Sequence, residues 1–576
     1  MERFNVFTNP ICVQHARARL RLMPTLSWGL ITLTCVAFIY VLIYFLLIKR
    51  GEVSPVDAAK AAVVPLIVVQ GVLLMGMGTS AVATGIARER DRELLDYHRM
   101  SPMTPAAKII GYLFGLPSRE YFLFALTLPF VAYAVLRGGV PLLKVAHFYV
   151  AFFSSVWLYH MTGLMAGMVS RKPWHSSFVS LGSVVVLYLV LPLFARVGLS
   201  FFDFLTVRPT FYGMVYEEIQ SAGQRPNIPS RIMLAQQYET VPFYGLSLNP
   251  TAFSLVVQVF VLTAMYHVVR RKWVDAAWHP FSKRFSLFFV FGVVTLLVGS
   301  IWPLLFDTQV HDELVDRMQW AGDTVILSLL IGLFFVVSGL AVLMTISLTT
   351  PTAQTSRKGL RRARKRGLDR IPLSWDAATS VPTMLVVLLI AVVGYVVVLL
   401  AIQSGPVYEI KAGMERWLVA LGVLSVLVVV AFQGMHERFG QRPVILGLFV
   451  FWVMPVMVGI IMFAAFDAWR PAMYIGALCP AVAGAMSLAL LLDASAGQVV
   501  DGSYLLRGSP VEDHARMVVA VTIVLYAGLA VIAQGLRYSA SCKRKRLERD
   551  TADLAERVTP RREVSHQPNP PPQVAG

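Results

Sequence analysis

Long apolar runs separated by short polar segments dominate the hydropathy pattern of this chain. Twelve runs are each about twenty residues long, the length of a helix that crosses a bilayer. They lie at 26–48, 62–84, 119–136, 145–168 and 175–196, from Pro250, and at 285–305, 324–347, 381–403, 414–433, 443–466 and 516–537. The pattern predicts an all-α polytopic membrane protein with about twelve transmembrane helices.

A further apolar run, at 471–493, is long enough to cross a membrane. Its Cys479-Pro480 pair parallels the Asn249-Pro250 pair before the sixth span, which favours a re-entrant or outer-face element. With twelve spans and the N-terminus inside, Lys and Arg concentrate on the cytoplasmic side, whereas a thirteenth span would erode that bias. We therefore expect twelve spans and cytoplasmic N- and C-termini.

Polar segments divide the spans into two sets. The first half, 26–284, carries a charged block at 85–111 after its second span and a long polar segment at 197–249, expected outside the membrane. The second half, 285–537, carries the basic segment 350–380 at the corresponding position. This order indicates an internal duplication, although no residue-by-residue repeat accompanies it.

The two ends of the chain are polar. Residues 1–25 include Asn9-Pro10 and a following segment that predicts an interfacial helix, with Ile11 and Val13 near one side. Its arginines Arg17, Arg19 and Arg21 either reach anionic headgroups or simply set the orientation of the first span. Residues 538–576 form a basic tail, expected to be cytoplasmic and disordered near its proline-rich end.

Composition agrees with a membrane protein, because 56% of the residues are hydrophobic and only 15% are charged. The net charge of +18 comes from basic residues between the spans, as topology requires, so we expect membrane lipid and no nucleic acid as a partner. The four cysteines, Cys12, Cys35, Cys479 and Cys542, show no metal or disulfide spacing.

The block at 85–111 is the most distinctive polar segment. Eight of the twelve residues from Arg88 to Arg99 are charged, so this stretch must lie in water beside the membrane. It predicts a helix in which Leu94, Leu95 and Tyr97 share one face.

Local signals mark the limits of that helix. Glu89 precedes Glu93 by one helical turn on its other side. Ser101-Pro102 should end the helix, and Thr104-Pro105 should begin a second short one. We expect Ile109 to Pro117 to lie along the surface, which places the third span after them.

At these residues the chain resembles the permease subunits of type-2 ABC exporters. That family has Glu-Arg, two variable residues, Gly-Thr-Leu-Glu and then Ser-Pro after its second span. Here Glu89-Arg90, Leu95-Asp96 and Ser101-Pro102 match, and Glu93-Leu94 depart from Gly-Thr. The interfacial helix near the N-terminus resembles the family's elbow helix.

The resemblance implies that the block contacts a separate ATP-binding subunit and passes its motion to the membrane helices. The residues expected to couple to this ATPase are Arg88, Glu89, Arg90, Glu93, Leu94, Leu95, Asp96, Ser101 and Pro102. Arg88, Glu89, Arg90 and Glu93 would make ion pairs, and Leu94 and Leu95 would form the apolar seat. The second insert lacks the pattern. The resemblance also implies the cell inner (plasma) membrane.

No stretch fits the phosphate-binding pattern GxxxxGK[ST], so ATP and Mg would be bound by the partner subunit. HExxH, paired CxxC and GxSxG motifs are also missing, so we expect no cofactor, no metal and no enzyme activity in this chain. Spans nearly free of carboxylates count against ion-coupled transport.

Some intramembrane residues allow two interpretations. His160 is either a functional polar site or a histidine hydrogen-bonded to a neighbouring helix, and we favour the second. Gln70 and Gln258 are expected to join helices in the same way. The pairs Gly111 with Gly115 and Gly163 with Gly167 are expected to serve packing.

The arginine-rich run 357–370 either binds anionic lipid or a partner's acidic surface, or merely keeps the loop on the cytoplasmic side, and we favour the last of these. Our first hypothesis for the whole chain is the permease of an ATP-driven exporter. The alternative is a membrane scaffold or assembly subunit that transports nothing. The sequence leaves open the substrate and whether two copies form a homodimer.

Overall fold

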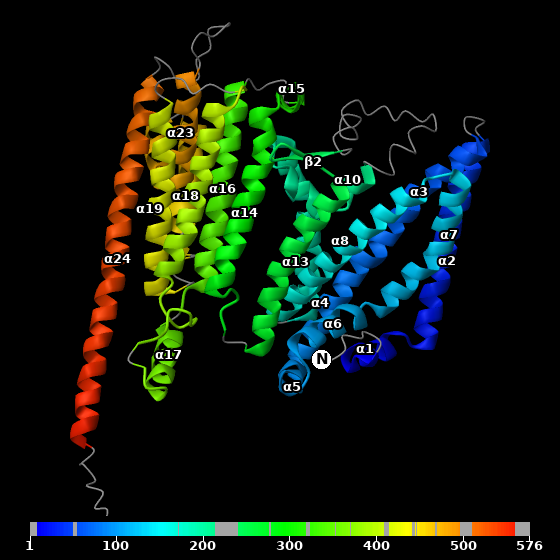
Figure 1. Ribbon diagram of the computed structural model, residues 1–576, viewed down its shortest axis with the longest axis horizontal. Coiled ribbons are helices and arrows are strands. Elements are labelled where there is room, and N and C mark those ends of the chain that lie inside the picture. Colours follow the sequence, from blue (N-terminus) through cyan, green and yellow to red (C-terminus); the bar gives the residue numbers. More distant parts are fainter. Residues whose placement is uncertain are drawn as a thin grey trace, which may run out of the picture.

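A computed structural model describes residues 8–49, 54–170, 172–212, 240–275, 278–317, 323–351, 353–368, 370–407, 414–440, 444, 446–447, 449–466, 469–495 and 510–558. Over these residues the regular structure is helical apart from one short hairpin, and eleven helices are long and apolar enough to cross a membrane. The expected fold class is confirmed: the chain is an all-α polytopic membrane protein. Its helices form two groups that stand side by side (Figure 1).

The first half of the chain supplies six of the candidate spans. They are α2 (Leu22–Lys49); a continuous helix of α3 (Pro55–Gly71), η2 (Val72–Gly78) and α4 (Thr79–Asp91); α7 (Ser118–Gly138); α8 (Leu142–Val169); α9 (Pro173–Val185), continued by η3 (Val186–Val190) and η4 (Leu191–Val197); and α13 (Pro250–Val274). Capping chemistry begins α13, because Asn249 Oδ1 accepts the N–H groups of Thr251 and Ala252, and Pro250 stands at the first helical position.

The second half supplies the other five candidate spans. They are α14 (Lys283–Phe306), α16 (Asp323–Thr349), α18 (Val381–Ser404), α19 (Glu415–Phe439) and α24 (Pro510–Val558). Short helices connect them: α15 (Thr308–Arg317) follows α14, and α17 (Ala353–Lys365) follows α16. The expected eleventh span, 443–466, is described only in part, as η7 (Phe449–Val453) and α21 (Met454–Phe466).

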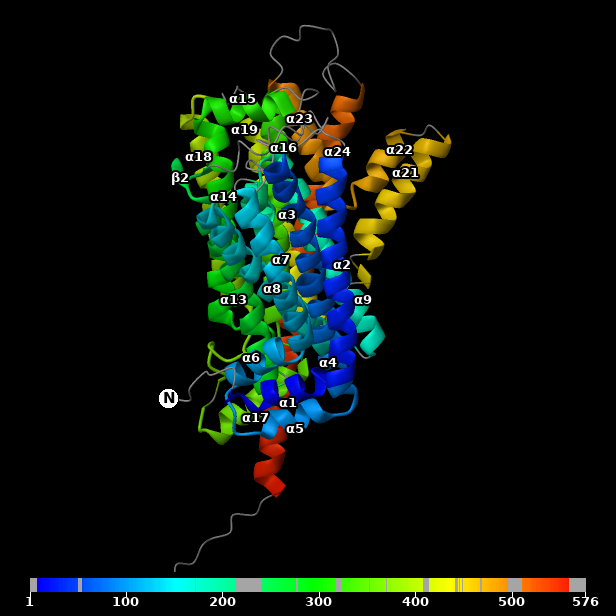
Figure 2. The ribbon, with the colours of Figure 1, turned by 90° about the vertical axis from the view of Figure 1, so that its right-hand side faces the viewer.

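The ambiguous run at 471–493 does not form one straight helix. Its two helices, α22 (Trp469–Gly476) and α23 (Pro480–Ser495), are bent by 119° at Cys479-Pro480. A proline at the first turn of α23 explains the break, since it cannot continue α22. This bend agrees with the expected re-entrant element. Figure 2 shows α21 and α22 together beside the main bundle.

The last span continues as a helix into the basic tail. The helix α24 runs past the expected end of the span near residue 537 and continues to Val558. The sequence explains this, because helix-forming residues fill the segment and opposite charges recur at four-residue spacing, as in Arg544 with Glu548 and Arg549 with Asp553. The proline-rich end, 559–576, lies outside the described residues.

The described parts of the segment 197–249 pack against the helices. Its first part forms η5 (Ser200–Leu205) and α10 (Arg208–Phe211), and Phe201, Phe204 and Leu205 are buried. These aromatic and leucine side chains join the core because they are too apolar to face water. The central part, 213–239, lies outside the described residues. The segment ends in an antiparallel hairpin of β1 (Val241–Phe243) and β2 (Leu246–Leu248), with Val241 opposite Leu248.

The hairpin joins the two halves at one end of the molecule. Tyr244 Oη donates a hydrogen bond to Thr295 O on α14 over 2.9 Å, and any side chain at Gly299 would overlap Phe243. The largest apolar core runs through this region and contains Val257 of α13 as well as Leu297 of α14. The opposite end carries α1 (Pro10–Arg19), α5 (Leu94–Met100) and α17, and we call it the block end (Figure 1).

Close helix contact in the first half depends on glycine, as expected. A Cβ at Gly163 would lie 2.6 Å from Thr79 O, and one at Gly167 would lie 2.6 Å from Ala83 O. Both distances are too short for a carbon atom, so α8 can approach α4 this closely only without side chains there. The helix pair forms the packed platform from which the block projects.

Candidate functional site at the charged block

The charged block is two helices, not the single helix expected across Arg88–Met100. The long helix ends at Asp91 with Arg92 as its cap, and Glu93 adopts a left-handed conformation with φ 59° and ψ 9° before α5 begins at Leu94. Arg92 N donates to Arg88 O and Glu93 N donates to Arg90 O, each over 3.1 Å, which closes the last turn of α4. The break separates Glu89 from Glu93, so the expected pairing of these two on one helical face was wrong.

Glu89 lies inside the protein rather than on the docking face expected for it. It is 8% exposed, and its Oε1 lies 3.0 Å from His15 Nε2 of α1. The hydroxyl of Tyr112, from α6 (Pro105–Gly115), donates a hydrogen bond to Glu89 Oε2. A buried carboxylate needs such partners because an unpaired charge in an apolar site is costly. Glu89 therefore anchors the block to α1 and α6.

Arg90 is exposed, and its guanidinium caps the neighbouring helix α8. Its Nη1 donates to Met168 O over 2.5 Å and to Ser170 O over 3.3 Å, at the C-terminal end of α8. A guanidinium suits this place because the last carbonyls of a helix have no partner in the helix and carry partial negative charge. Arg88 and Arg90 are both exposed, and Arg90 forms this cap.

The apolar residues of α5 divide between its two faces. Leu95 is 6% exposed and belongs to a cluster with Ile109, Tyr112 and Trp273. Leu94 is 41%, Tyr97 68% and Met100 79% exposed. The expectation that Leu94, Leu95 and Tyr97 share one face was wrong, because α5 starts anew after Glu93. Leu94, Tyr97 and Met100 recur at three-residue intervals and form the outer face of α5.

A buried lysine of α6 holds the C-terminal end of α5. Lys108 of α6 is 3% exposed, and its Nζ donates to Arg99 O over 3.3 Å and to Ser101 O over 3.1 Å. Burial lowers the pKa of Lys108 below its ordinary value. Ser101 Oγ donates to His98 O over 3.0 Å. The helix ends at Met100 and exposed Pro102 follows, which confirms the expected stop.

A second helix begins where the sequence indicated. Thr104 Oγ1 accepts the N–H of Ala107 over 3.3 Å, and Pro105 occupies the first helical turn of α6.

Asp96 and Arg99 form an ion pair on the surface of α5. Asp96 and Glu93 both remain exposed, so the outer side of the block keeps acidic groups.

The N-terminal helix α1 packs directly on α6. Asn9 Nδ2 donates to Ala107 O over 2.7 Å, and a Cβ at Gly111 would lie 2.7 Å from Asn9 Oδ1. A Cβ at Gly115 would lie 2.9 Å from Cys12 Cα, so this glycine pair serves packing as expected. Arg19 Nε donates to Leu116 O over 2.9 Å instead of reaching outward.

The block also contacts the end of α13 and, through it, the second half. Arg99 Nη2 donates to Lys272 O over 3.3 Å. The neighbouring Arg271 forms an ion pair with Asp376, which follows α17, and donates from Nε to His279 O over 2.8 Å. Burial lowers the pKa of His279. The end of α13 is thus in contact with both inserts.

A lysine in the second half holds the loop after α17. Lys283 Nζ donates to Leu373 O, Ala378 O and Thr379 O, each over 3.0 Å. Thr379 in turn donates to Glu437 Oε2 over 3.2 Å, and Arg537 Nη1 of α24 lies 3.7 Å from that carboxylate. Polar contacts therefore cross the block end from α5 to α24.

His160 is fully buried in α8 and joins two helices. Its Nε2 lies 3.0 Å from Leu74 O, and its Nδ1 lies 3.4 Å from Tyr121 Oη. Leu74 belongs to the π-helical turn η2, in which carbonyl groups lose their usual i+4 partners. A Cβ at Gly78 would lie 2.6 Å from His160 Nε2, so glycine makes room for the imidazole. This geometry is that of an interhelical hydrogen bond.

The two intramembrane glutamines have similar surroundings. Gln70 Nε2 donates to Thr127 Oγ1 over 2.9 Å, and its Oε1 accepts from Tyr149 Oη over 2.8 Å. Gln258 Nε2 donates to Ser155 Oγ over 3.0 Å and to Phe204 O over 3.2 Å. Each amide therefore links separate helices, as expected for polar residues in a membrane.

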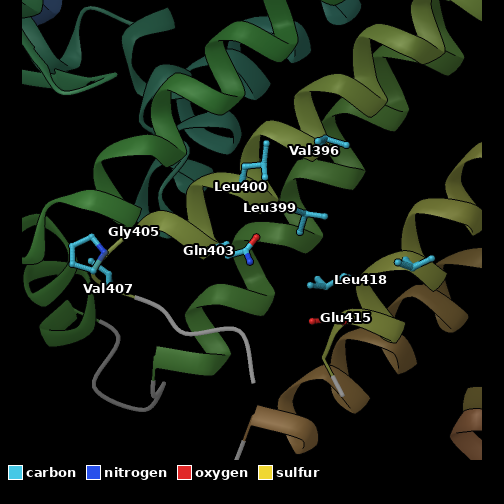
Figure 3. A pocket seen from close by; sticks show the side chains of 10 residues that line it. Val396, Leu399, Leu400, Gln403, Gly405, Val407, Glu415 and Leu418 are labelled. Carbon is cyan, nitrogen blue, oxygen red and sulfur yellow. The ribbon is translucent and has the colours of Figure 1, made fainter. Parts of the chain in front are cut away.

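A cavity of about 820 Å³ lies away from the block, at the far ends of α18 and α19 (Figure 3). Apolar side chains such as Leu399 and Leu418 form most of its wall, with Gln403 and Glu415 among the lining residues. None of the expected site residues lines it. Within the described part of the chain, no group of three or more His, Cys, Asp and Glu side chains could hold a metal ion.

Sequence reasoning missed the residues that anchor the block: His15, Lys108, Tyr112 and Trp273. Lys108 and Tyr112 are one turn apart on α6, and such a polar pair inside an otherwise apolar helix is a usable signal. His15 and Trp273 give no local signal, because their contacts come from distant parts of the chain.

Comparisons with protein-family profiles, with curated proteins and with solved structures found no match to this chain. The fold is that of a polytopic all-α membrane protein in which a folded, charged block follows the second span.

Proposed function

We propose that this chain is the permease of an ATP-driven exporter of the type-2 ABC class. In this proposal the block end faces the cytoplasm at the cell inner membrane, and a separate ATP-binding subunit supplies ATP and Mg. That subunit docks on the outer face of α5, formed by Leu94, Tyr97 and Met100. The observation that carries the proposal is this short helix, which is anchored at both ends and exposes three apolar side chains beside the acidic Asp96.

The construction of α5 suits the transfer of force. Glu89 and Leu95 fix its beginning to α1 and α6, and Lys108 fixes its end. A partner that pushes on Tyr97 or Met100 would therefore move the helices below instead of bending a loop. An ordinary solvated loop would not need buried charges to hold it.

The backbone at Glu93 adds support from the sequence pattern. Exporter permeases have glycine where this chain has Glu93, and the residue here has φ 59°, a conformation that glycine adopts most easily. The departure at Glu93 therefore leaves the turn of the pattern intact. A left-handed residue other than glycine costs about 1–2 kcal/mol, which indicates that the surrounding contacts hold this turn in place.

The contacts of α13 suggest how movement would reach the second half. Arg99 touches the end of α13 at Lys272, and Arg271 pairs with Asp376 on the other side. Nucleotide binding would stabilise one arrangement of the two halves more than the other. The apolar core and the hairpin at the far end would serve as the fixed side of this movement.

The proposal is tested by purification of the full chain in mild detergent, with mass spectrometry and an ATPase assay on the eluate. The test variant is Tyr97→Ala/Met100→Ala, which removes two exposed side chains and the ring contact of Tyr97 with its neighbour His98. The matched control is Leu22→Ala/Met23→Ala, two residues of α2 that are 70% and 74% exposed. We expect a P-loop ATPase with the wild type and the control, and at least a roughly tenfold loss with the test variant, as for truncated interface anchors.

The outcomes separate the two functions considered. If no P-loop ATPase accompanies the wild type, the exporter proposal fails and the scaffold alternative takes its place. Equal retention by both variants would show that the ATPase binds elsewhere and that α5 is not its seat. Crosslinking of the purified chain reports whether two copies form a homodimer.

A further inference from the structure

Helix α17 carries a dense set of basic residues on one side. Its exposed members are Arg357, Lys358, Arg361, Arg362, Arg364 and Lys365. At about 100° per residue these six occupy roughly half of the helix circumference. The other side holds Gly359 and Ala363, which are buried. The helix thus has one packed face and one continuous cationic face.

The orientation of this helix is fixed by its packing. A Cβ at Gly359 would overlap Ala377 Cβ, so α17 lies in direct contact with the loop after it. Lys283 holds that loop through three carbonyl groups, and Arg271 pairs with its Asp376. Packing therefore fixes the orientation of the cationic face. A basic segment that only keeps a loop on the cytoplasmic side does not require a fixed orientation.

Four basic side chains of α17 have no acidic partner in the described part of the chain. Among the described residues, no carboxylate lies within ion-pair distance of Arg357, Lys358, Arg361 or Arg362. Arg357 with Arg361, and Lys358 with Arg362, are like charges one helical turn apart, a spacing that destabilises a helix. An external polyanion would relieve this repulsion.

We propose that α17 binds anionic phospholipid headgroups at the membrane surface of the block end. The helix starts four residues after the candidate span α16 ends at Thr349, so its first turn would lie near the headgroups. In the segment that follows α17, Leu368 is 40% and Leu373 62% exposed, and Arg366 stacks on Trp375 at 5.1 Å. Basic side chains next to exposed apolar and tryptophan side chains are typical of a surface that meets the membrane interface.

The test uses the purified full chain in neutral detergent and short-chain phosphatidylglycerol, with phosphatidylcholine as the uncharged probe. Native mass spectrometry counts bound lipid, and hydrogen exchange locates the protected amides. We expect a preference for phosphatidylglycerol that weakens from about 50 to about 300 mM salt, and protection of 353–365. The variant Arg357→Gln/Lys358→Gln/Arg361→Gln/Arg362→Gln should lose at least about tenfold in affinity.

Two further variants make the test specific. The control Lys543→Gln/Arg544→Gln/Lys545→Gln/Arg546→Gln removes four charges from α24 and should keep the preference. Arg357→Lys/Arg361→Lys/Arg362→Lys keeps the charge and should also bind. Equal binding by wild type and the neutralised variant would overturn the proposal, as would equal losses in that variant and the control. The proposal would also be overturned if the neutralised variant bound lipid like the wild type but lost an acidic protein that co-purifies with the wild type. This inference is independent of the proposed function.

Discussion

The two halves of this chain place an insert at the same point, after their second span, and build it in opposite ways. In the first half, charged groups are buried beneath α5: Glu89 and Lys108 hold it from inside, and apolar side chains face outward. In the second half, α17 packs through Gly359 and Ala363, and its charges face outward. The two inserts occupy equivalent positions in the two halves but expose different surfaces. The surface of α5 suits a protein partner, and that of α17 suits a polyanionic surface.

This difference also concerns energetics. A buried carboxylate or ammonium must keep all its partners, so the α5 insert depends on a few specific contacts. The α17 insert depends on close backbone approach, which tolerates many changes on the outer face but none on the packed face. The predictions below test these two dependences, from the largest expected effect to the smallest.

Removal of the central carboxylate should disturb the first insert most. Glu89→Leu leaves the hydroxyl of Tyr112 and the imidazole of His15 without their acceptor, so we expect a loss of about 3 kcal/mol in stability. Thermal unfolding of the detergent-solubilised chain measures this loss, and hydrogen exchange should show faster exchange at 86–100. Glu93→Gln, an exposed carboxylate nearby, serves as control and should change neither quantity. An unaltered unfolding temperature in Glu89→Leu would show that the buried cluster does not anchor α5.

The second insert should respond to a single methyl group. Gly359→Ala places its Cβ on that of Ala377, and we expect a cost of about 1–3 kcal/mol with loosening of α17. The double variant Gly359→Ala/Ala377→Gly removes the opposing Cβ and should restore much of the loss. Hydrogen exchange of 353–365 measures both effects, with α5 as the internal reference. Failure of the second substitution to rescue the first would mean that this contact does not fix the helix.

The smallest expected effect concerns the break between α4 and α5. Glu93→Gly relieves the left-handed strain but adds freedom to the unfolded chain, so we expect a net gain of about 0.5 kcal/mol. Glu93→Ala keeps the strain and should give no gain, which makes it the matched comparison. Thermal unfolding of the two variants side by side provides the measurement. Equal stability of both would indicate that the turn relaxes away from the left-handed region.

Much of the fold follows from sequence because the membrane imposes a strong length rule. Spans such as 119–136 and 381–403 match α7 and α18 within a few residues. Helix ends could also be predicted from local sequence. Asn249 and Thr104 cap the starts of helices, and Ser101-Pro102 follow the end of α5, as expected. These signals involve neighbours in the chain, so one sequence is enough to interpret them.

The errors arose where distant contacts decide the structure. Glu89 was expected outside because it stands in a charged stretch, but His15 and Tyr112 from other helices make its burial favourable. The helix break at Glu93 could not be predicted, because neither glycine nor proline marks it in the sequence. The continuation of α24 beyond its span was not predicted, because polarity indicates where a helix leaves the membrane, not where it ends.

The length of α24 makes it a lever. It has 49 residues and is therefore about 74 Å long, more than twice the thickness of the hydrocarbon core. A tilt of about 10° around its centre would move each end by about 6 Å. Small rearrangements among packed membrane helices would thus become large displacements at Val558, where a fluorescent or spin label could record them.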